Sequence, residues 1–331
     1  MIDGVINVYK EKGYTSHDVV AKLRGILRQK KIGHTGTLDP DASGVLPVCL
    51  GKATRLCDML TQKQKIYQAV LLLGRETDTQ DVWGKTIREQ SIEGGGINED
   101  MVRQAVMGFV GAYDQIPPMY SALKVNGKKL YELARAGKTV ERQPRQVFIY
   151  NIEIQSIELP KAYMTVCCSK GTYIRTLCHD IGARLGCGGC MEGLVRTQVE
   201  RFKLEDSLTL AEIEALRDQG TLMEHIVSIE AMFSHYLSAA TEQKWDHLSQ
   251  NGNPLKAEQV RLWQDAEGPE GEKKETEDFA HKGSIKEFYS ENVEDGTCFR
   301  IYDSRGKFMG IYLWEKEKAQ LRPFKMFFDN C

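Results

Sequence analysis

A glycine-rich loop at residues 33–44, GHTGTLDPDASG, carries the carboxylate best placed to do chemistry. Its glycines let the backbone approach a ligand closely and adopt conformations that other residues avoid. Pro40 directly follows Asp39 and restricts the backbone there. Such a loop can hold the Asp39 carboxylate rigidly at the mouth of a cleft, as a nucleophile requires. The loop by itself is also compatible with a polar surface turn, in which an Asp-Pro pair is common.

Three other residues could act with Asp39. Arg175 lies in the first turn of a predicted helix, where the helix dipole disfavours a cation. An anion should therefore offset its charge, either the Asp39 carboxylate or an RNA phosphate. Tyr67, early in a predicted strand, could stack on an unstacked base, an interaction worth about 1–3 kcal/mol. Tyr173 carries the same interpretation. Alternatively, the tyrosines belong to the core and Arg175 is an unpaired surface residue.

The segment 117–145 has the composition of an RNA-binding surface. Residues 101–150 contain eight Lys and Arg against three Asp and Glu. The basic side chains run from Lys124 to Arg145 and are interleaved with Tyr120 and Tyr131. Charge combined with aromatic stacking is typical of single-stranded RNA recognition. A solvated helix face is the alternative.

Other chemical motifs are weaker. GKAT at 51–54 lacks the spacing of a P-loop. Asp39, Asp41 and Ser43 share the D-x-D-x-S/T spacing of aspartyl-phosphate phosphatases, but that motif normally ends an apolar strand and here it follows GHTGTL. Cys187 and Cys190 form a C-x-x-C without the second ligand pair that a zinc site needs. We therefore expect neither metal nor cofactor.

The elements that must position these residues follow from apolar spacing. Strands are predicted at 4–9, 45–50, 65–73, 146–158 and 162–169. Helices are predicted from residue 15 or 16 to 27, at 53–60, from a cap at Asn98, from the Asn126-Gly127 turn to about 136, from near 172, at 209–217 and at 223–231. Tyr67 should share one face of its strand with Ala69 and Leu71.

The pattern predicts two domains. A mixed α/β (α+β) body with a β-sheet core and flanking helices covers 1–235, and a small β-rich domain covers 236–331. In the second, 298–302 and 308–314 flank Asp303-Ser304-Arg305-Gly306 as a hairpin. The acidic, glycine-containing stretch 264–278 is interpreted as an inserted loop.

Composition is that of a cytosolic globular protein. The chain has 331 residues, 41% of them hydrophobic, and a net charge of −2. Residues 1–200 carry 27 Lys and Arg against 21 Asp and Glu, a net of +6, so a basic part could meet phosphates. The nine cysteines are an odd number in a large chain, which indicates reduced thiols. We expect no membrane span, no secretory signal, a cytoplasmic location and a monomer.

Four segments in order resemble the TruB family of tRNA pseudouridine synthases. They are GHTGTLDPDASGVLPVCLGKATRL at 33–56, IYQAVLLLGRETDTQDVWG at 66–84, QIPPMYSALKVNGKKLYELAR at 115–135 and GTYIRTLCHDIGARLG at 171–186. The N-terminal family motif K-P-x-G-x-S/T-S reads KEKGYTS at 10–16, with Glu11 in place of proline. LVRTQVERF at 194–202 departs from the family pattern at Val195 and Glu200. The C-terminal domain, with LRPFKMFF at 321–328, resembles a PUA-type RNA-binding domain.

The resemblance implies the pseudouridine synthase fold, a tRNA substrate and no cofactor. The target would be the uridine at position 55 in the T-loop, flipped out of its stack and isomerised. Asp39 would be the catalytic aspartate, Tyr67 the active-site tyrosine and Arg175 the partner of the carboxylate. The resemblance further implies that substrate contacts come from Lys10, His34, Tyr173, Lys124 and Leu194, of which His34 would help to fill the space left by the flipped base.

The sequence leaves open the chemical route that Asp39 takes and one alternative function. Asp39 could attack ribose C1′, attack uracil C6 or assist a glycal-like route. Hydrolysis of the glycosidic bond is disfavoured, because glycosidases usually place two carboxylates on either side of that bond. A tRNA-folding chaperone or RNA scaffold without essential catalysis would use the same basic segment. For the protein itself we expect no obligate protein partner.

Overall fold

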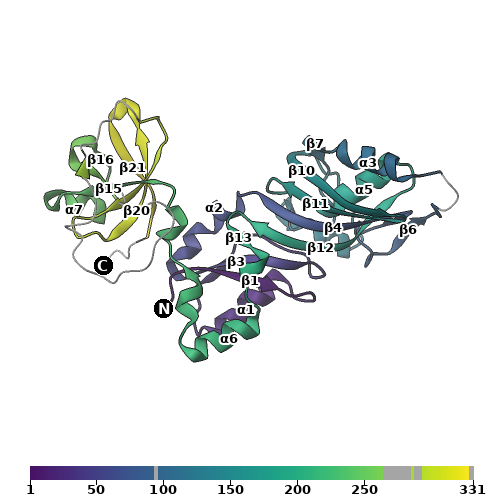
Figure 1. Ribbon diagram of the computed structural model, residues 1–331, viewed down its shortest axis with the longest axis horizontal. Helices are drawn as coiled ribbons and strands as arrows, with labels where there is room; N and C mark the ends of the chain where they lie inside the picture. Colours follow the sequence, from purple (N-terminus) through teal and green to yellow (C-terminus); the bar gives the residue numbers. More distant parts are fainter. Residues whose placement is uncertain (93–95, 264–284, 287–292, 328–331) are drawn as a thin grey trace. The chain divides into compact units, whose positions relative to one another are not determined.

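The computed structural model describes residues 1–92, 96–263, 285–286 and 293–327 (Figure 1). The chain divides into two compact units. The larger consists of Ile6–Cys49 and Leu56–His225, and the smaller of Met1–Val5, Leu50–Arg55 and Ile226–Cys331. The smaller unit thus takes in two short N-terminal pieces that the sequence placed in the larger domain.

The larger unit is built on a mixed β-sheet with the strand order β1-β3-β12-β4-β11-β10-β7. These strands are β1 (Gly4–Lys10), β3 (Ser43–Leu50), β12 (Gly189–Val199), β4 (Lys65–Leu73), β11 (Lys161–Cys168), β10 (Arg145–Glu158) and β7 (Gly111–Gln115). Strand β12 runs parallel to β3 and antiparallel to β4, and the strands beyond β4 are antiparallel to their neighbours. The mixed α/β class predicted from the sequence is confirmed.

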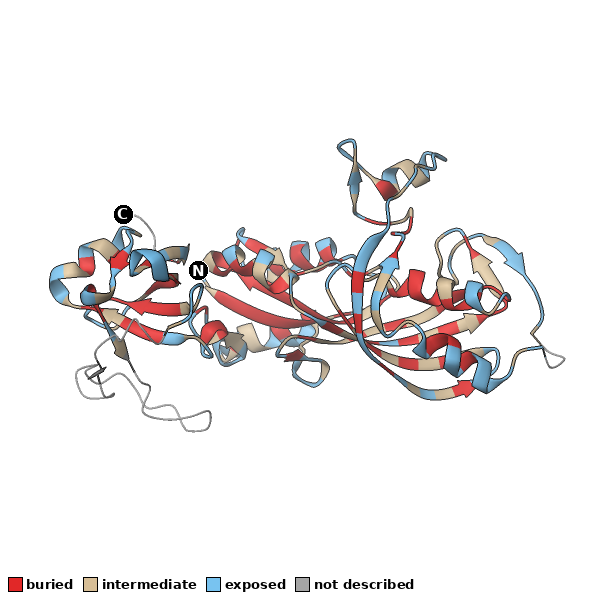
Figure 2. Ribbon diagram, turned by 90° about the horizontal axis from the view of Figure 1, so that it is seen from above, coloured by how far each residue is buried: buried red, intermediate tan, exposed pale blue. Residues whose placement is uncertain are grey.

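Helices cover one face of this sheet and bury its core. Helices α3 (Glu99–Met107) and α5 (Ile174–Arg184) contribute Val102 and Leu177 to one cluster with Tyr67, Ala69 and Leu71 of β4. The buried positions run along the strands and along one side of each helix (Figure 2). The prediction that Tyr67, Ala69 and Leu71 share a buried face is therefore confirmed.

Helix α1 (Ser16–Ile26) lies against α6 (Leu210–Gln219) at the other end of the sheet (Figure 1). Thr15 begins α1 with a capping box, in which its side chain accepts a hydrogen bond from the Asp18 backbone and the Asp18 side chain bonds back. Asn98 is the N-cap of α3, as predicted from the sequence. These caps fix where the helices begin, and hence where the connecting loops must run.

Shorter elements complete the larger unit. They are β2 (Ile32–His34), which pairs with β3, β13 (Phe202–Lys203), which pairs with β12, the hairpin β5 (Arg75–Thr77) with β6 (Thr86–Glu89), the hairpin β8 (Lys124–Val125) with β9 (Lys128–Lys129), and helix α4 (Leu130–Arg135). No helix in the part of the chain that the structure describes is long and apolar enough to span a membrane.

Several details differ from the prediction, among them the strand β7, which was not predicted. The helix expected at 53–60 is a 3-10 turn, Gly51–Leu56, followed by a short α2 (Cys57–Thr61), because the Thr54 hydroxyl donates to the Gly51 carbonyl and tightens the turn. The helix expected at 223–231 is replaced by 3-10 turns around β14 (Ile226–Val227), whose β-branched residues favour an extended backbone. Strand β12 was not predicted, because two register shifts break its period-two pattern.

The smaller unit contains a second sheet with the order β16-β21-β20-β19-β15-β17-β18. Its elements are β15 (Leu237–Thr241), α7 (Asp246–Gln250), β16 (Leu255–Lys256), β17 (Val260–Trp263), β18 (Ile285–Lys286), β19 (Cys298–Tyr302), β20 (Phe308–Glu315) and β21 (Gln320–Met326). The β19–β20 hairpin predicted around Asp303 is confirmed, and the Asp303 carboxylate closes it by accepting from the backbone of Arg305 and Lys307. The predicted acidic loop 264–278 lies outside the described residues.

Candidate active site

The side chains of Ser16 and Lys10 hold the loop that carries Asp39 in place. This loop leaves β2 and enters β3, and the Leu38 backbone N–H donates to the Ser16 hydroxyl at 3.0 Å. The Lys10 ammonium donates to the carbonyls of Ala42 at 2.6 Å and Pro40 at 3.2 Å. The loop ends at Gly44, whose φ of 110° is unfavourable for other residues. The carboxylate at the tip is therefore on a supported loop.

Lys10 was expected to contact the substrate, and the structure places it inside the protein. Its side chain is fully buried, and its third hydrogen bond goes to the Glu11 carbonyl at 3.1 Å. Burial lowers the pKa of Lys10 to about 8, against the opposing effect of the Asp39 charge. The contacts of Lys10 support the Asp39 loop, while a direct contact with RNA stays a prediction.

The low pKa of Lys10 predicts a loss of activity in mildly alkaline solution. Above about pH 8 the ammonium loses a proton, so that two N–H groups remain for three carbonyls. Loss of one such hydrogen bond costs about 1 kcal/mol, so the rate of the reaction proposed below should fall by about fivefold. Single-turnover rates between pH 6.5 and 9.5 test this, with Lys10→Met as the control. The variant should be slower and lack the change near pH 8; the same alkaline fall in both proteins would contradict the assignment.

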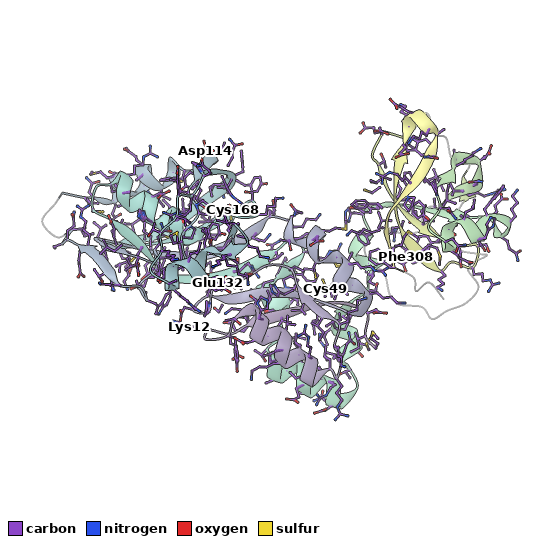
Figure 3. All side chains as sticks on the ribbon, turned by 180° about the vertical axis from the view of Figure 1, so that it is seen from behind. Lys12, Cys49, Asp114, Glu132, Cys168 and Phe308 are labelled. Carbon is purple, nitrogen blue, oxygen red and sulfur yellow. The ribbon has the colours of Figure 1, made fainter. Side chains whose placement is uncertain are left out.

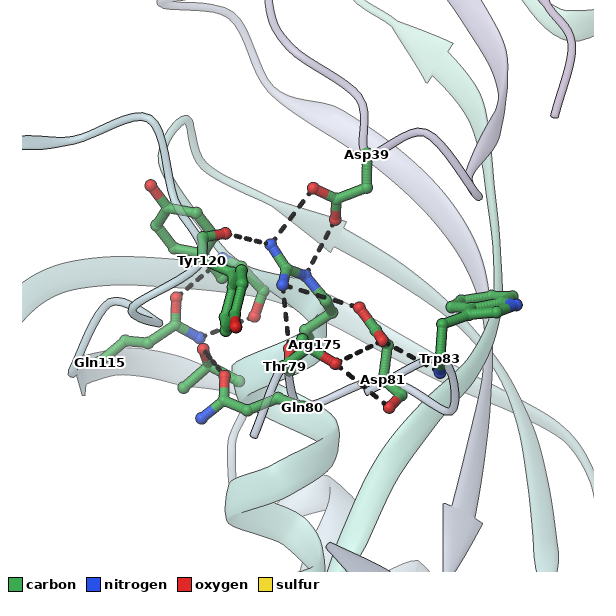
Figure 4. A network of polar contacts seen from close by, with 10 residues as sticks. Asp39, Thr79, Gln80, Asp81, Trp83, Gln115, Tyr120 and Arg175 are labelled. Carbon is green, nitrogen blue, oxygen red and sulfur yellow. Dashed lines mark hydrogen bonds and ion pairs between the residues drawn. The ribbon is translucent and has the colours of Figure 1, made fainter. Parts of the chain in front are cut away.

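Arg175 and Asp39 form a two-pronged ion pair at the centre of the site (Figure 4). The Arg175 Nε lies 2.9 Å from Asp39 Oδ2, and its Nη2 donates to Asp39 Oδ1 at 3.2 Å. The Arg175 side chain is 5% exposed and that of Asp39 is 37% exposed. Bidentate pairing of this kind fixes the orientation of the carboxylate as well as its charge. The pairing of Arg175 with Asp39, one of two possibilities indicated by the sequence, is therefore present.

The remaining donors of Arg175 are also used. Its Nη1 donates to the Thr79 carbonyl at 2.9 Å, and its Nη2 also donates to the Tyr120 carbonyl at 2.8 Å. These acceptors come from the turn after β5 and from the start of the basic segment 117–145. Because Arg175 is the second residue of α5, the core contacts of that helix set its position. Helix α5, the turn after β5 and the start of the segment 117–145 thus together hold the guanidinium against Asp39.

Asp81 is a second carboxylate at Arg175 that the sequence analysis did not single out. Its Oδ2 lies 3.7 Å from Arg175 Nη1, and its Oδ1 accepts from the Thr79 hydroxyl at 2.6 Å. Burial raises the pKa of Asp81, whereas Thr79 and Arg175 act in the opposite direction. The signal that could have identified Asp81 as a site residue was its place in the segment TDTQD, between two short strands.

Tyr67 and Leu194 belong to the buried core of the larger unit, and a buried arginine lies next to Tyr67. Tyr67 is paired with Arg196 across β4 and β12, and Leu194 belongs to the same core cluster as Tyr67. Burial raises the pKa of Tyr67, and the neighbouring Arg196 opposes this rise through its charge and a hydrogen bond. Arg196 is 1% exposed, and its Nε donates to the Val45 carbonyl at 2.7 Å. Its Nη2 is buried without a hydrogen-bond partner among the residues that the structure describes.

His34 and Tyr173 are two further residues that the sequence predicted for the site. Burial and the nearby His17 lower the pKa of His34, and its Nδ1 accepts from the Gly36 backbone at 3.4 Å, which fits a neutral imidazole. The backbone of Tyr173 is bracketed by the Gln115 side chain, which accepts from its N–H at 2.8 Å and donates to its carbonyl at 3.0 Å. Burial raises the pKa of Tyr173. Both residues are half-buried.

Lys124 is the one predicted site residue on an outlying element. It is exposed on the β8–β9 hairpin, while Tyr120 from the same segment reaches Arg175 through its carbonyl. Lys10, Tyr67 and Tyr173 lie near enough to Asp39 for its charge to act on their pKa values. His34 lies near Arg196 in the same sense, and Lys124 is exposed. In the described part of the chain, no cluster of His, Cys, Asp and Glu has the arrangement of a metal site.

The fold is shared with chains of solved structures. A solved H/ACA RNP bound to a substrate RNA containing 2′-deoxyuridine includes a chain with a TM-score of 0.67 and 25% identity, matching 98% of this chain and 85% of that one. A Cbf5–Nop10–Gar1 complex gives a TM-score of 0.68 and 26% identity over the same shares. These similarities show the fold, and the match of residues 24–174 to a model of pseudouridylate synthases defines the class as pseudouridine synthases.

Sequence comparison narrows the class to one family. Residues 24–174 match the N-terminal domain model of TruB family pseudouridylate synthases, and 175–234 match the C-terminal domain model of tRNA pseudouridylate synthase B. The tRNA pseudouridine synthase B of Lachnoclostridium phytofermentans is 47% identical over 98% of this chain and all of that protein. That of Clostridium perfringens (strain SM101) is 41% identical over 94% of each. The chain belongs to the TruB family of pseudouridine synthases, which confirms the family predicted from the sequence.

Proposed function

We propose that this chain converts the uridine at position 55, in the T-loop of tRNA, to pseudouridine. The relatives named above are tRNA pseudouridine synthases B, which supports a tRNA substrate. The observation that carries the proposal is the Asp39–Arg175 pair, in which a buried guanidinium holds a half-exposed carboxylate by two contacts. The protein is expected to act in the cytoplasm as a monomer.

The reaction needs one bond broken and one bond formed. The bond from ribose C1′ to uracil N1 breaks, the base turns, and C1′ rejoins through C5. The C5 proton leaves and N1 gains a proton, so atoms and charge balance without an oxidant or reductant. The Asp39 carboxylate acts as the nucleophile: it bonds to ribose C1′ as uracil N1 leaves, and it is released when uracil C5 bonds to C1′, while Arg175 keeps it oriented. Base flipping brings the uridine to the loop, since the target atoms are inaccessible within a stacked RNA.

Tyr67 is proposed to act on the base. Its ring stacks against the flipped uracil, and its hydroxyl takes part in removing the C5 proton at the end of the reaction. Arg196 acts through Tyr67 as a positioning residue, because it bonds the Val45 carbonyl next to the Asp39 loop and lies beside the Tyr67 hydroxyl. His34, Leu194 and Tyr173 are proposed to line the space that the flipped nucleotide enters, and Lys10 and Lys124 to support the loop and the RNA backbone respectively.

Tyr67→Phe separates the ring of this residue from its hydroxyl. We expect tRNA affinity to stay within about twofold, because the stacking face is retained. The single-turnover rate should fall by about 10²–10⁴-fold, as is typical when a general acid or base is lost. If Arg196 acts through the hydroxyl, Arg196→Met should slow the native protein by about tenfold and the Tyr67→Phe protein hardly at all. Fully multiplicative effects would refute the coupling, and an unimpaired Tyr67→Phe enzyme would remove the hydroxyl from the mechanism.

A tritium-release assay tests the proposed reaction. Unmodified tRNA transcript with tritium at uracil C5 should release one tritium per molecule, because only rejoining through C5 expels that hydrogen. A transcript with the T-loop uridine replaced by cytidine should release none. Release from the replaced transcript would contradict the position, and formation of free uracil would show hydrolysis in place of isomerisation.

A further inference from the structure

An exposed tryptophan stands beside the site and is not used by the mechanism. Trp83 is 43% exposed on the turn between β5 and β6. Large aromatic side chains usually bury most of their surface, so an exposed indole next to a binding site is a candidate contact for a ligand. The same turn contains Thr79 and Asp81, both of which contact Arg175. In Figure 4 the indole lies on the side of Asp81 that faces away from Arg175.

Hydrogen bonds within the turn hold the backbone that carries this indole. The Trp83 backbone N–H donates to Asp81 Oδ1 at 3.2 Å, and the Lys85 N–H donates to Asp78 Oδ1 at 2.8 Å. A Cβ at Gly84 would lie 2.1 Å from the Thr79 hydroxyl, so the turn is closely packed on its inner side. An aromatic ring on such a turn loses little conformational freedom on binding.

A cation accompanies the ring. The Lys12 ammonium lies 4.8 Å from the centroid of the Trp83 ring, and Lys12 is exposed on the loop between β1 and α1 (Figure 3). This loop precedes α1, whose Ser16 contacts the Asp39 loop. An indole next to an ammonium offers a stacking surface for a base and a charge for the phosphate attached to it. That pair of features fits one nucleotide of single-stranded RNA.

We propose that Trp83 and Lys12 bind a nucleotide adjoining the target uridine, with its base on the indole and its phosphate on the ammonium. The inference rests on the proposed function, in that the partner is the RNA whose uridine reaches Asp39. A nucleotide next to a flipped one loses a stacking neighbour, and the indole replaces that neighbour. Trp83 is thereby a substrate-binding residue that contributes to affinity and to the choice of RNA.

Binding measurements on the full-length protein test this platform. A T-stem-loop RNA is titrated into Asp39→Asn protein, so that binding is measured without turnover. Trp83→Ala should weaken binding by about 5–150-fold, the range for loss of one base–aromatic stack, and Trp83→Phe by less. Lys12→Gln should weaken binding and reduce its dependence on salt. Tyr150→Ala is the matched control, since Tyr150 is 49% exposed on β10 and is expected to leave affinity unchanged.

Indole fluorescence gives a second readout that a purely structural role would not produce. Stacking of a base should quench the fluorescence of Trp83. Addition of RNA should therefore lower the tryptophan fluorescence of the native protein, and most of this decrease should be absent in Trp83→Phe. In proteins with Asp39 intact, Trp83→Ala should raise KM and leave kcat within about twofold, because uniform binding is lost. Unchanged affinity and quenching in the Trp83 variants, with isomerisation intact, would overturn the platform alone. Absence of isomerisation by the native protein would overturn the proposed function instead, whatever the quenching shows.

Discussion

Asp39→Asn should reduce isomerisation by at least about 10⁴-fold while tRNA affinity changes little, as expected for loss of a catalytic nucleophile. The carboxamide has nearly the shape of the carboxylate, but it is a poor nucleophile and turns an N–H toward Arg175. Arg175 keeps its bonds to the Thr79 and Tyr120 carbonyls, so the surrounding structure should persist. Single-turnover rates with excess enzyme, beside a filter-binding titration of the same RNA, measure the two quantities separately.

Asp41→Asn is the matched control for this experiment. Asp41 lies on the same loop, two residues away, and is half-exposed. The control should keep activity within about tenfold, because Asp41 is not among the partners of Arg175 and its substitution removes only a nearby charge. If both variants lost RNA binding together, the loop would serve binding, as in an RNA scaffold, and the catalytic assignment of Asp39 would fail.

Arg175→Lys should slow the reaction by about 10²–10³-fold, although the positive charge is kept. An ammonium cannot contact both oxygens of Asp39 in one plane and also reach the Thr79 and Tyr120 carbonyls. Arg175→Met should be at least as slow, and the loss of donors to buried acceptors should lower the free energy of unfolding by about 1–3 kcal/mol. Rates at saturating RNA and denaturant unfolding curves measure these effects.

The lysine and methionine variants together show what Arg175 supplies. Full activity in Arg175→Lys would mean that charge alone suffices and that the two-pronged geometry is incidental. Full activity in Arg175→Met would mean that Asp39 needs no partner. Arg184→Lys, at the far end of α5, is a control that changes an arginine of the same helix without touching the Asp39 loop.

The centre of the site could be predicted because it depends on local signals. Neighbouring residues suffice to recognise the glycine-rich loop with Asp39. They also suffice to recognise Arg175 as a cation opposed by the dipole of its own helix. The fold class, the strands β1, β3, β4, β10 and β11 and the caps of α1 and α3 followed from spacing in the same way. Each of these features is set by interactions over a few residues.

The parts that could not be predicted depend on contacts between distant segments. Arg196 lies on β12, and its proposed role depends on its contacts with Val45 and Tyr67, which are far from it in sequence. Asp81 approaches Arg175 only because the turn after β5 folds onto α5. Lys10 has the appearance of a surface lysine in sequence, yet three carbonyls of the folded chain surround its ammonium. Sequence spacing carries no record of such contacts.

The arrangement is prepared before RNA binds. Arg175 already contacts Asp39, Thr79 and Tyr120, and the Asp39 loop already rests on Lys10. A site organised in this way spends little binding energy on rearranging its own groups during the reaction. Under the proposed function, binding energy from the predicted RNA contacts of the basic segment and from the proposed Trp83 platform then serves to flip the uridine.

The most direct test of the account is to map pseudouridine by position in an unmodified tRNA transcript after incubation with the native protein and with Asp39→Asn. A single pseudouridine at position 55 with the native protein, and none with the variant, is the predicted result. Equal conversion by the two proteins would show that the carboxylate held by Arg175 is not what breaks and reforms the bond to the base.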